Sequence, residues 1–223
     1  MASYDLVVLG AGPGGYVTAI RAAQLGMKVA LIEREAVGGV CLNWGCIPSK
    51  ALIRNAEVLS TINDAERFGI SIQGEISADY SFGVARSRQV VDRLTRGVDS
   101  LLKKNKIDLF IGNARFIDTN QIGIGDKKID ARNIVVATGA RPRLLLSVEV
   151  DGTVVVTYRE AIVQTTCPKN VVIIGGGVIG VEFAYIYRAY GANVTIVEME
   201  GSVLPREDEE ISKLLTRSLE SQG

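Results

Sequence analysis

The chain has 223 residues, more than the most common size of a single domain, so we expect one large or two smaller domains. Its 25 basic and 25 acidic residues balance, which argues against a nucleic-acid partner held by excess positive charge. The sequence contains no histidine, which excludes the commonest general base and the commonest metal ligand.

The hydropathy pattern predicts a protein that does not enter a membrane. Apolar residues make up 47% of the chain, but no apolar run reaches the roughly 20 residues that span a bilayer. The first residues, MASYDLVVLGAG, enter a strand directly, without a basic leader or a cleavage site. We therefore expect a cytoplasmic protein without a membrane partner.

The first elements form the pattern of a dinucleotide-binding βαβ unit. A short apolar run, YDLVVLG, predicts a buried parallel strand, and the turn GAGPGG leads from it into a helical stretch, YVTAIRAAQLG. A second strand, KVALIE, ends at Glu33. Gly10 would make the tight turn, Gly12 would let a pyrophosphate approach the backbone, and Gly15 would allow close helix packing. Glu33 would accept hydrogen bonds from an adenosine ribose.

A cysteine pair follows in the segment GGVCLNWGCIPSK. Cys41 and Cys46 come within disulfide reach if the helical turn between them is distorted, which Gly45 and Pro48 favour. Lys50 adds a positive charge that would favour a thiolate or a neighbouring anionic group.

Two other interpretations of the cysteine pair stay open at this point. Zinc binding lacks ligands, because there is no histidine and Cys167 lies far along the chain, so we expect no metal site. Two buried free cysteines would not need the glycines, Asn43, Pro48 and Lys50 around them. Cys167, before Pro168, is expected to be inert.

The middle of the chain predicts a helix and several strands. Residues 81–104 form an amphipathic pattern, and residues 106–129 give short strands with turn signals, as in a β-meander. Residues 133–140 predict a buried strand that breaks at Gly139, where backbone amides could approach a ligand. We expect the domain boundary at residues 144–152, followed by a strand and a helix within residues 153–163. The apolar face predicted for the amphipathic helix comprises Val84, Val91, Leu94, Val98, Leu101 and Leu102.

The dinucleotide pattern then recurs. Gly10, Gly12, Gly15 and Glu33 correspond to Gly175, Gly177, Gly180 and Glu198, each shifted by 165 positions. One glycine motif is weak evidence, whereas two copies with the same strands, helix and acidic residue are strong evidence. A carboxylate at Glu198 would repel a 2′-phosphate, so the second site is expected to prefer NAD to NADP.

The cysteine segment closely resembles the redox-disulfide signature of the pyridine nucleotide-disulfide oxidoreductases. The resemblance covers the whole chain, from the first glycine motif through ATGARP to GGGVIGVE. The ending Pro48-Ser49-Lys50, together with Glu198, is typical of the lipoamide branch; the glutathione reductase branch usually has a second lysine and NADP-binding arginines.

The resemblance implies an α/β fold with two domains. Residues 1–147 would form a Rossmann-like FAD-binding domain with a β-meander insertion and the redox disulfide. Residues 148–223 would form an incomplete NAD-binding Rossmann unit.

The resemblance also implies roles for individual residues. Cys46 would be the thiolate that faces the flavin, and Cys41 would exchange with the substrate disulfide. Lys50 would lie near the flavin and pair with Glu182 close to the nicotinamide. FAD would contact Gly10, Gly12, Gly15, Glu33, Lys50, Ala114, Thr138 and Gly139, and NAD would contact Gly175, Gly177, Gly180 and Glu198.

The reaction implied is the oxidation of dihydrolipoyl groups by the cysteine pair, with electrons passing through FAD to NAD⁺. The substrate would be the lipoyl group of a 2-oxoacid dehydrogenase or glycine cleavage complex, and the whole protein would be a homodimer. The chain departs from the family pattern at Val40, where a threonine is common, and at Leu146-Ser147, which replace a Pro-Gly turn.

Since the resemblance stops at Gly223, inside the second unit, we expect an N-terminal portion without the dimerisation domain and its His–Glu acid–base pair. Two alternatives remain: an FAD-binding fragment without turnover, and an enzyme similar to mercuric reductases.

Overall fold

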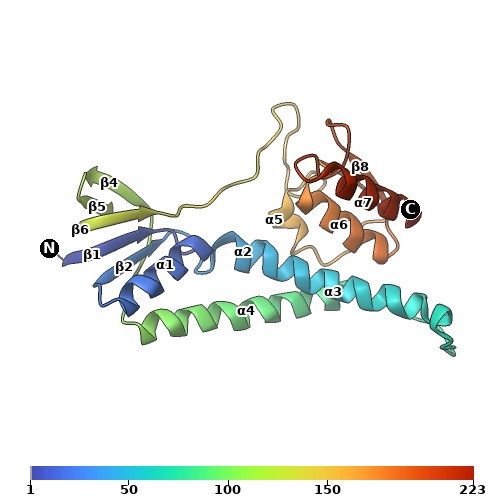
Figure 1. Ribbon diagram of the computed structural model, residues 1–223, viewed down its shortest axis with the longest axis horizontal. Helices are drawn as coiled ribbons and strands as arrows, with labels where there is room; N and C mark the ends of the chain where they lie inside the picture. The colour runs from blue at the N-terminus through green and yellow to red at the C-terminus, as the bar shows by residue number, and fades with distance from the viewer. Residues whose placement is uncertain (1) are drawn as a thin grey trace. The chain divides into compact units, whose positions relative to one another are not determined.

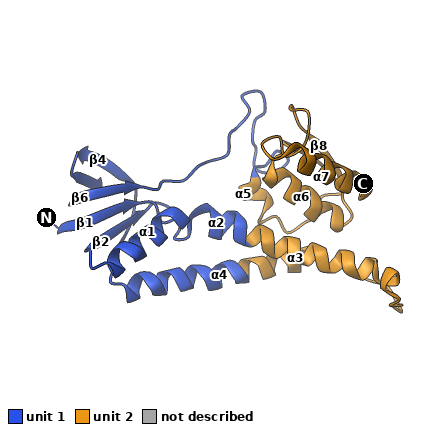
Figure 2. Cartoon of the chain, in the orientation of Figure 1, with its two compact units in different colours: residues 1–47, 89–157 blue, residues 48–88, 158–223 orange. Residues whose placement is uncertain are grey.

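The computed structural model describes residues 2–223 and has an α/β fold with a mixed sheet, as predicted (Figure 1). The chain divides into two compact units (Figure 2). The first comprises Met1–Ile47 and Gln89–Thr157, and the second comprises Pro48–Arg88 and Tyr158–Gly223. These two units are defined by contacts between residues. The predicted boundary at residues 147 and 148 separates an FAD-binding from an NAD-binding domain, and it stays a prediction.

A six-stranded sheet forms the centre of the first unit, in the order β3-β2-β1-β6-β5-β4. Strands β3, β2, β1 and β6 run parallel to one another, whereas β5 runs antiparallel to β6 and β4 runs antiparallel to β5. β1 lies inside the sheet, and its Val7 and Val8 are fully buried. The strands are β1 (Ala2–Leu9), β2 (Val29–Glu33), β3 (Asp108–Ile111), β4 (Ala114–Asp118), β5 (Gln121–Ile124) and β6 (Lys127–Val136).

Helices α1 (Pro13–Gln24) and α4 (Tyr80–Lys104) supply the apolar layer over one face of this sheet. Ala19 of α1 and Val98 of α4 pack with Leu6 and Val8 of β1. The side chains on the opposite face form a second cluster, in which Ile32 packs with residues of β5 and β6. The centre of the sheet, at β1 and β2, is thus buried between two apolar clusters.

The predicted β-meander is present as β4, β5 and β6, which pair antiparallel in succession, whereas residues 108–111 pair in parallel with β2. Two other predictions for the middle of the chain need correction. The strand predicted at residues 133–140 ends at Val136 and is not buried, since Val136 is 60% exposed. On α4 the predicted apolar face is buried at Val84, Val91, Val98 and Leu102 but not at Leu94 and Leu101.

The strand predicted within residues 153–163 was wrong, although the helix there exists as α5 (Tyr158–Ala161). The Asp151 carboxylate accepts hydrogen bonds from the backbone amides of Thr153, Val154 and Val155 at 2.7 to 3.0 Å. These bonds lower the pKa of Asp151 to about 2. They fold the segment into a turn and use the donors that a strand needs.

The second unit contains a two-stranded parallel sheet of β7 (Asn170–Ile174) and β8 (Asn193–Val197). Helix α6 (Val178–Ala189) connects these strands, and α7 (Glu209–Ser221) follows β8. The second unit also takes in most of α3 (Cys46–Asn63), the 3-10 helix η1 (Ala65–Phe68) and the beginning of α4. The arrangement β7-α6-β8 reproduces β1-α1-β2, as the repeat predicts.

Within the described residues 2–223, every helix is too short or too polar to cross a membrane.

Candidate functional site

The first glycine motif forms a tight loop between β1 and α1 at the carboxyl edge of the sheet. Gly10 has φ +99°, a conformation that disfavours side chains, and a Cβ there would lie 2.2 Å from the carbonyl oxygen of Ala137. A Cβ on Gly15 would lie 1.7 Å from the carbonyl oxygen of Gly10. These two glycines are therefore required by turn geometry and by close packing of the helix.

Gly12 is different, because neither backbone conformation nor packing requires a glycine there. Its φ of −71° and ψ of −177° suit any residue, and the nearest atom to a Cβ would be the Cα of Gly39 at 3.8 Å. The open backbone at this glycine leaves room for a ligand to approach the N-terminus of α1. The loop thus fits the pyrophosphate of a dinucleotide.

Glu33, at the end of β2, lies against this loop. It is 8% exposed, and its carboxylate accepts hydrogen bonds from the backbone N–H of Ala11 at 2.7 Å and of Glu35 at 2.8 Å. A carboxylate has further lone pairs, so Glu33 keeps the capacity to accept a ribose hydroxyl. The structure places the acid where the pattern of the βαβ unit requires it.

The cysteine segment packs directly on the glycine loop. Gly38 donates its N–H to the carbonyl oxygen of Ala11 at 2.8 Å. Gly39, with φ +58°, has no room for a side chain, since a Cβ would lie 2.6 Å from the Cα of Gly12. Helix α2 (Gly39–Trp44) therefore begins in contact with the loop that would hold the pyrophosphate.

Cys41 and Cys46 form a disulfide, with their Cα atoms 4.6 Å apart. Cys41 lies in α2 and Cys46 is the first residue of α3, so the helical path is interrupted between them, as predicted. Gly45 makes this break with φ −127° and ψ −115°, and a Cβ there would lie 3.1 Å from the carbonyl oxygen of Val40. Asn43 donates its amide to the carbonyl oxygens of Val37 and Gly39, both at 2.9 Å. These contacts hold the disulfide against the loop.

Thr138 and Gly139 follow β6 and lie beside the same loop. Ala137, just before them, donates its N–H to Leu9 at 2.8 Å, and its carbonyl oxygen faces Gly10. Thr138 and Gly139 are exposed. Ala114 begins β4, two residues after Gly112, which donates its N–H to the carbonyl oxygen of Glu33. All the cofactor residues predicted in the first unit thus lie near the carboxyl ends of β1, β2 and β6.

The second unit repeats this geometry. Gly175 has φ +111°, and a Cβ on Gly180 would lie 2.0 Å from the carbonyl oxygen of Gly175. A Cβ on Gly177 would have no neighbour within 4 Å, although its φ of −71° suits any residue. As in the first loop, neither packing nor backbone conformation requires a glycine at the middle position.

The Glu198 carboxylate accepts hydrogen bonds from the backbone N–H groups of Gly176, Met199 and Glu200 at 2.6, 2.7 and 3.0 Å. These donors, chiefly Glu200 and Gly176, lower the pKa of Glu198. Gly176 and Glu200 correspond to Ala11 and Glu35, so the two acids make equivalent contacts.

Lys50 and Glu182 form an ion pair within the second unit, with Nζ 2.5 Å from Oε1. Lys50 and Glu182 occupy equivalent positions, each being the fifth residue of its helix, α3 and α6. The lysine side chain is 60% exposed and the glutamate side chain 21%. Their proposed places beside the flavin and the nicotinamide stay predictions.

Sequence reasoning missed several residues that shape the site. Gly38 and Gly39 anchor the cysteine segment, and the only available signal was their position before Cys41. An ion pair of 2.7 Å joins Arg141, which follows the exposed end of β6, to Glu35 beside β2. A separation of 106 positions left no local signal for this pair.

Cys167 is a half-buried free cysteine, and burial raises the pKa of its thiol. The inert role expected for it stays a prediction. Residues 2–223 contain no group of three or more His, Cys, Asp or Glu side chains suited to a metal ion.

Comparisons with known proteins agree with this geometry. The family model for pyridine nucleotide-disulphide oxidoreductases matches residues 4–223. A dihydrolipoyl dehydrogenase of Rhizobium etli is 44% identical over 240 residues, covering 99% of this chain and 50% of the relative. Another, of Zymomonas mobilis, is 46% identical over 226 residues and covers 99% and 48%. The chain thus spans about half the length of these relatives.

Solved structures show the same fold over the whole chain. The HOCl-induced flavoprotein disulfide reductase RclA from Escherichia coli, in a Cu(II) complex, gives a TM-score of 0.85 at 30% identity, covering 100% of this chain and 48% of that one. LpdA from Mycobacterium tuberculosis gives 0.87 at 25% identity, covering 100% and 50%. Members of this family use FAD and NAD(H). With its whole length matched and its disulfide seated on a dinucleotide loop, the chain belongs to the pyridine nucleotide-disulphide oxidoreductase family.

Proposed function

We propose that this chain is the FAD-binding, NAD-binding and disulfide-bearing part of a dihydrolipoyl dehydrogenase. One observation carries the proposal: the Cys41–Cys46 disulfide is anchored on the first glycine loop through Gly38 and Gly39. Such an arrangement brings a redox-active pair close to a bound dinucleotide. The dihydrolipoyl dehydrogenases among the relatives support the choice of substrate.

The residues of the two glycine loops would hold the cofactors. Gly10, Gly12, Gly15, Glu33, Ala114, Thr138 and Gly139 would hold FAD, with Lys50 near its ring, and Gly175, Gly177, Gly180 and Glu198 would hold NAD. A bound flavin would carry two electrons from the cysteine pair to NAD⁺ as a hydride. The ionised Glu198 would favour NAD because a 2′-phosphate would meet like charge.

The cysteine pair would take up the electrons by thiol–disulfide exchange. A thiolate of the dihydrolipoyl group attacks the sulfur of Cys41, breaks the Cys41–Cys46 bond and leaves Cys46 as a thiolate. The second substrate thiol loses its proton and attacks the substrate sulfur of this mixed disulfide. The lipoyl disulfide leaves, and Cys41 takes up a proton. Cys46 stands at the N-terminus of α3, where the helix dipole favours its thiolate form.

The substrate in this proposal is the lipoyl group of a 2-oxoacid dehydrogenase or glycine cleavage complex, and the whole protein acts as a homodimer. A cytoplasmic setting is part of the proposal, since a reducing compartment suits a pair that cycles between dithiol and disulfide.

The test is dihydrolipoamide-dependent reduction of NAD⁺ by the purified chain supplied with FAD. The unaltered chain and Cys167→Ser are expected to form NADH, whereas Cys41→Ser and Cys46→Ser should lose at least a hundredfold in rate, because neither can form the disulfide. Bound FAD without any NADH formation would contradict turnover and favour the FAD-binding fragment.

A further inference from the structure

Helices α3 and α6 are joined at two points in the second unit. The first is the exposed ion pair between Lys50 and Glu182. The second is a hydrogen bond between the Asn55 side chain, one and a half turns further along α3, and the hydroxyl of Tyr190, which directly follows α6. An exposed ion pair contributes little to stability, and its long side chains lose conformational entropy when they pair. The second contact is therefore the better candidate for fixing the two helices.

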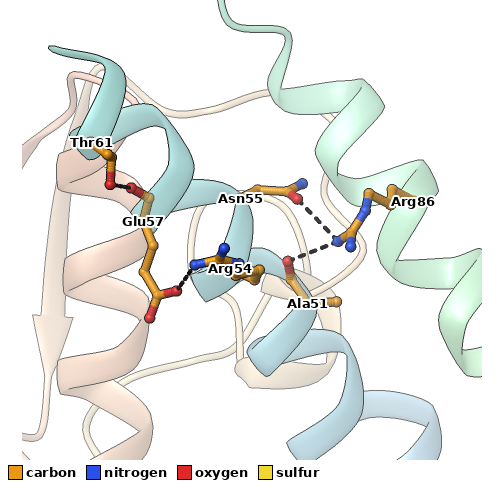
Figure 3. Close-up of polar contacts among 6 residues, drawn as sticks. All are labelled: Ala51, Arg54, Asn55, Glu57, Thr61 and Arg86. Atoms are coloured by element: carbon orange, nitrogen blue, oxygen red, sulfur yellow. Dashed lines mark hydrogen bonds and ion pairs between the residues drawn. The ribbon is translucent and has the colours of Figure 1, made fainter. Parts of the chain in front are cut away.

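Asn55 has a partner for each end of its amide. Its Oδ1 accepts a hydrogen bond from Nη1 of Arg86 on α4 at 3.1 Å, and the same nitrogen lies 3.4 Å from the carbonyl oxygen of Ala51 (Figure 3). Its Nδ2 lies on the side of Tyr190, since a Cβ at Gly83 would come within 2.9 Å of both Nδ2 and the tyrosine hydroxyl oxygen, and we assign Nδ2 as the donor to that hydroxyl. Burial raises the pKa of Tyr190, and the bond from Asn55 opposes part of that increase.

Gly83 of α4 makes room for this junction. A Cβ at Gly83 would lie 2.9 Å from both Nδ2 of Asn55 and the hydroxyl oxygen of Tyr190. Glycine inside a helix is less favourable than alanine, so the buried Gly83 needs a structural reason. Gly97 of the same helix is exposed, and a Cβ there would meet nothing within 4 Å.

Aromatic packing supports the same junction from α4. The rings of Tyr80 and Tyr190 meet edge to face with their centroids 5.0 Å apart, and Tyr80 also lies 6.2 Å from Tyr187. Tyr80 is buried. The beginning of α4 thus contacts α6 through rings and α3 through Arg86 and Asn55.

We propose that Asn55 is a positioning residue: by binding Arg86 and Tyr190 through its two amide atoms, it fixes α3 against α6 so that Lys50 meets Glu182. This inference rests on the proposed function, in which Lys50 and Glu182 stand beside the flavin and the nicotinamide. Asn55 itself contacts neither cofactor in this proposal and acts only through the ion pair.

The first test compares alanine at the two glycines of α4. Gly83→Ala is expected to lower the free energy of unfolding, whereas Gly97→Ala should raise it. Both substitutions gain helix propensity, but only the methyl group at position 83 would clash with Asn55 and Tyr190. Tyr190→Phe removes the hydroxyl oxygen, one of the two atoms that the new methyl group would crowd. Gly83→Ala should therefore destabilise the Tyr190→Phe protein less than the unaltered chain, which fold-changes in the unfolding equilibrium constant measure. Equal effects at Gly83 and Gly97 would contradict the junction.

The second test measures flavin reduction by NADH in the FAD-loaded chain. Asn55→Ala is expected to lower the limiting rate about tenfold with little change in the half-saturating NADH concentration, because a displaced pair misaligns the reacting groups. In a Glu182→Gln background the pair is already broken, so Asn55→Ala should cause no further loss. The matched control is Arg54→Gln on the same helix, which removes an exposed ion pair with Glu57, 3.0 Å away (Figure 3); it should leave both values unchanged.

Losses from Asn55→Ala that multiply with those from Glu182→Gln would overturn the positioning role. If NADH fails to reduce the flavin of the unaltered chain, the proposed function is contradicted instead. The positioning role of Asn55 is then tested by unfolding experiments without cofactor. In the unaltered chain, Lys50→Met and Glu182→Gln should be coupled by about two- to fivefold in the unfolding constant. In the Asn55→Ala background the coupling should disappear, so that the two substitutions have independent effects. An unchanged coupling would overturn the proposal.

Discussion

Gly12 and Gly177 differ from the neighbouring glycines of their loops, because neither backbone conformation nor packing requires a glycine at these two positions. We predict that Gly12→Ala folds with normal stability, since its φ of −71° and open surroundings accept a side chain. The added Cβ should weaken FAD binding at least tenfold by filling the path of the pyrophosphate. FAD titration by fluorescence and unfolding in urea measure the two effects.

The matched control is Gly15→Ala, whose Cβ would lie 1.7 Å from the carbonyl oxygen of Gly10. It should lose about 3 kcal/mol of stability through overpacking. Normal FAD affinity in folded Gly12→Ala would contradict the assignment of the loop.

The Glu198 carboxylate gives a prediction about pH. Its pKa is lowered from the ordinary 4.5 by backbone donors, so its contribution to stability is full above that value and is lost as the pH falls through the lowered pKa. The stability difference between the unaltered chain and Glu198→Gln should therefore shrink with acidification below about pH 4.5. Thermal unfolding across that range measures it, and a difference that grew on acidification would contradict the role of these donors.

Residue patterns predicted the glycines and acids of both loops, because βαβ geometry fixes their spacing along the chain. They could not predict the Arg141–Glu35 pair or the contacts of Asn55, since these depend on which elements meet in space. The Lys50–Glu182 pair was expected from family resemblance alone, and the structure contains it.

At the scale of elements, the end of α4 differs from those of α1 and α6. Lys106 occupies the left-handed position after α4 with φ +54°, where α1 has Gly26 and α6 has Gly191. Its N–H bonds the carbonyl oxygen of Lys103, and the N–H of Ile107 bonds that of Leu102, which is a Schellman ending.

We predict that Lys106→Gly stabilises the chain by about 1 kcal/mol, because glycine adopts this conformation without strain. Gly26→Ala is the reverse control: a Cβ there meets nothing within 4 Å, so its loss of about 1 kcal/mol would come from the backbone alone. Urea unfolding measures both, and destabilisation by Lys106→Gly would refute the explanation.

Helices and strands were predicted correctly where the apolar periodicity was strong. The prediction failed where a side chain forms hydrogen bonds with the backbone amides. The helices after both glycine loops and the long α4 follow from their apolar spacing. The β-branched run after Gly152 looked like a strand, but Asp151 takes its amide donors first. The end of β6 looked buried because it is apolar, yet Val136 is exposed beside the glycine loop.

At the scale of the whole molecule, the chain contains the same βαβ unit twice, once in each compact unit. The first copy differs by carrying the disulfide against its glycine loop. Sequence comparison within the chain revealed the duplication, but the seating of α2 on Gly12 required the structure. This seating leads to the central claim that a flavin held by the first loop lies next to the cysteine pair.

The most direct test of that claim is the absorption spectrum of the chain loaded with FAD, before and after anaerobic addition of dithiol. We predict a flavin spectrum that gains a long-wavelength charge-transfer band when the disulfide is reduced, and we expect Cys46→Ser to abolish that band and Cys167→Ser to keep it. A chain that binds no flavin, or whose flavin spectrum shows no such band when the disulfide is reduced, would contradict it.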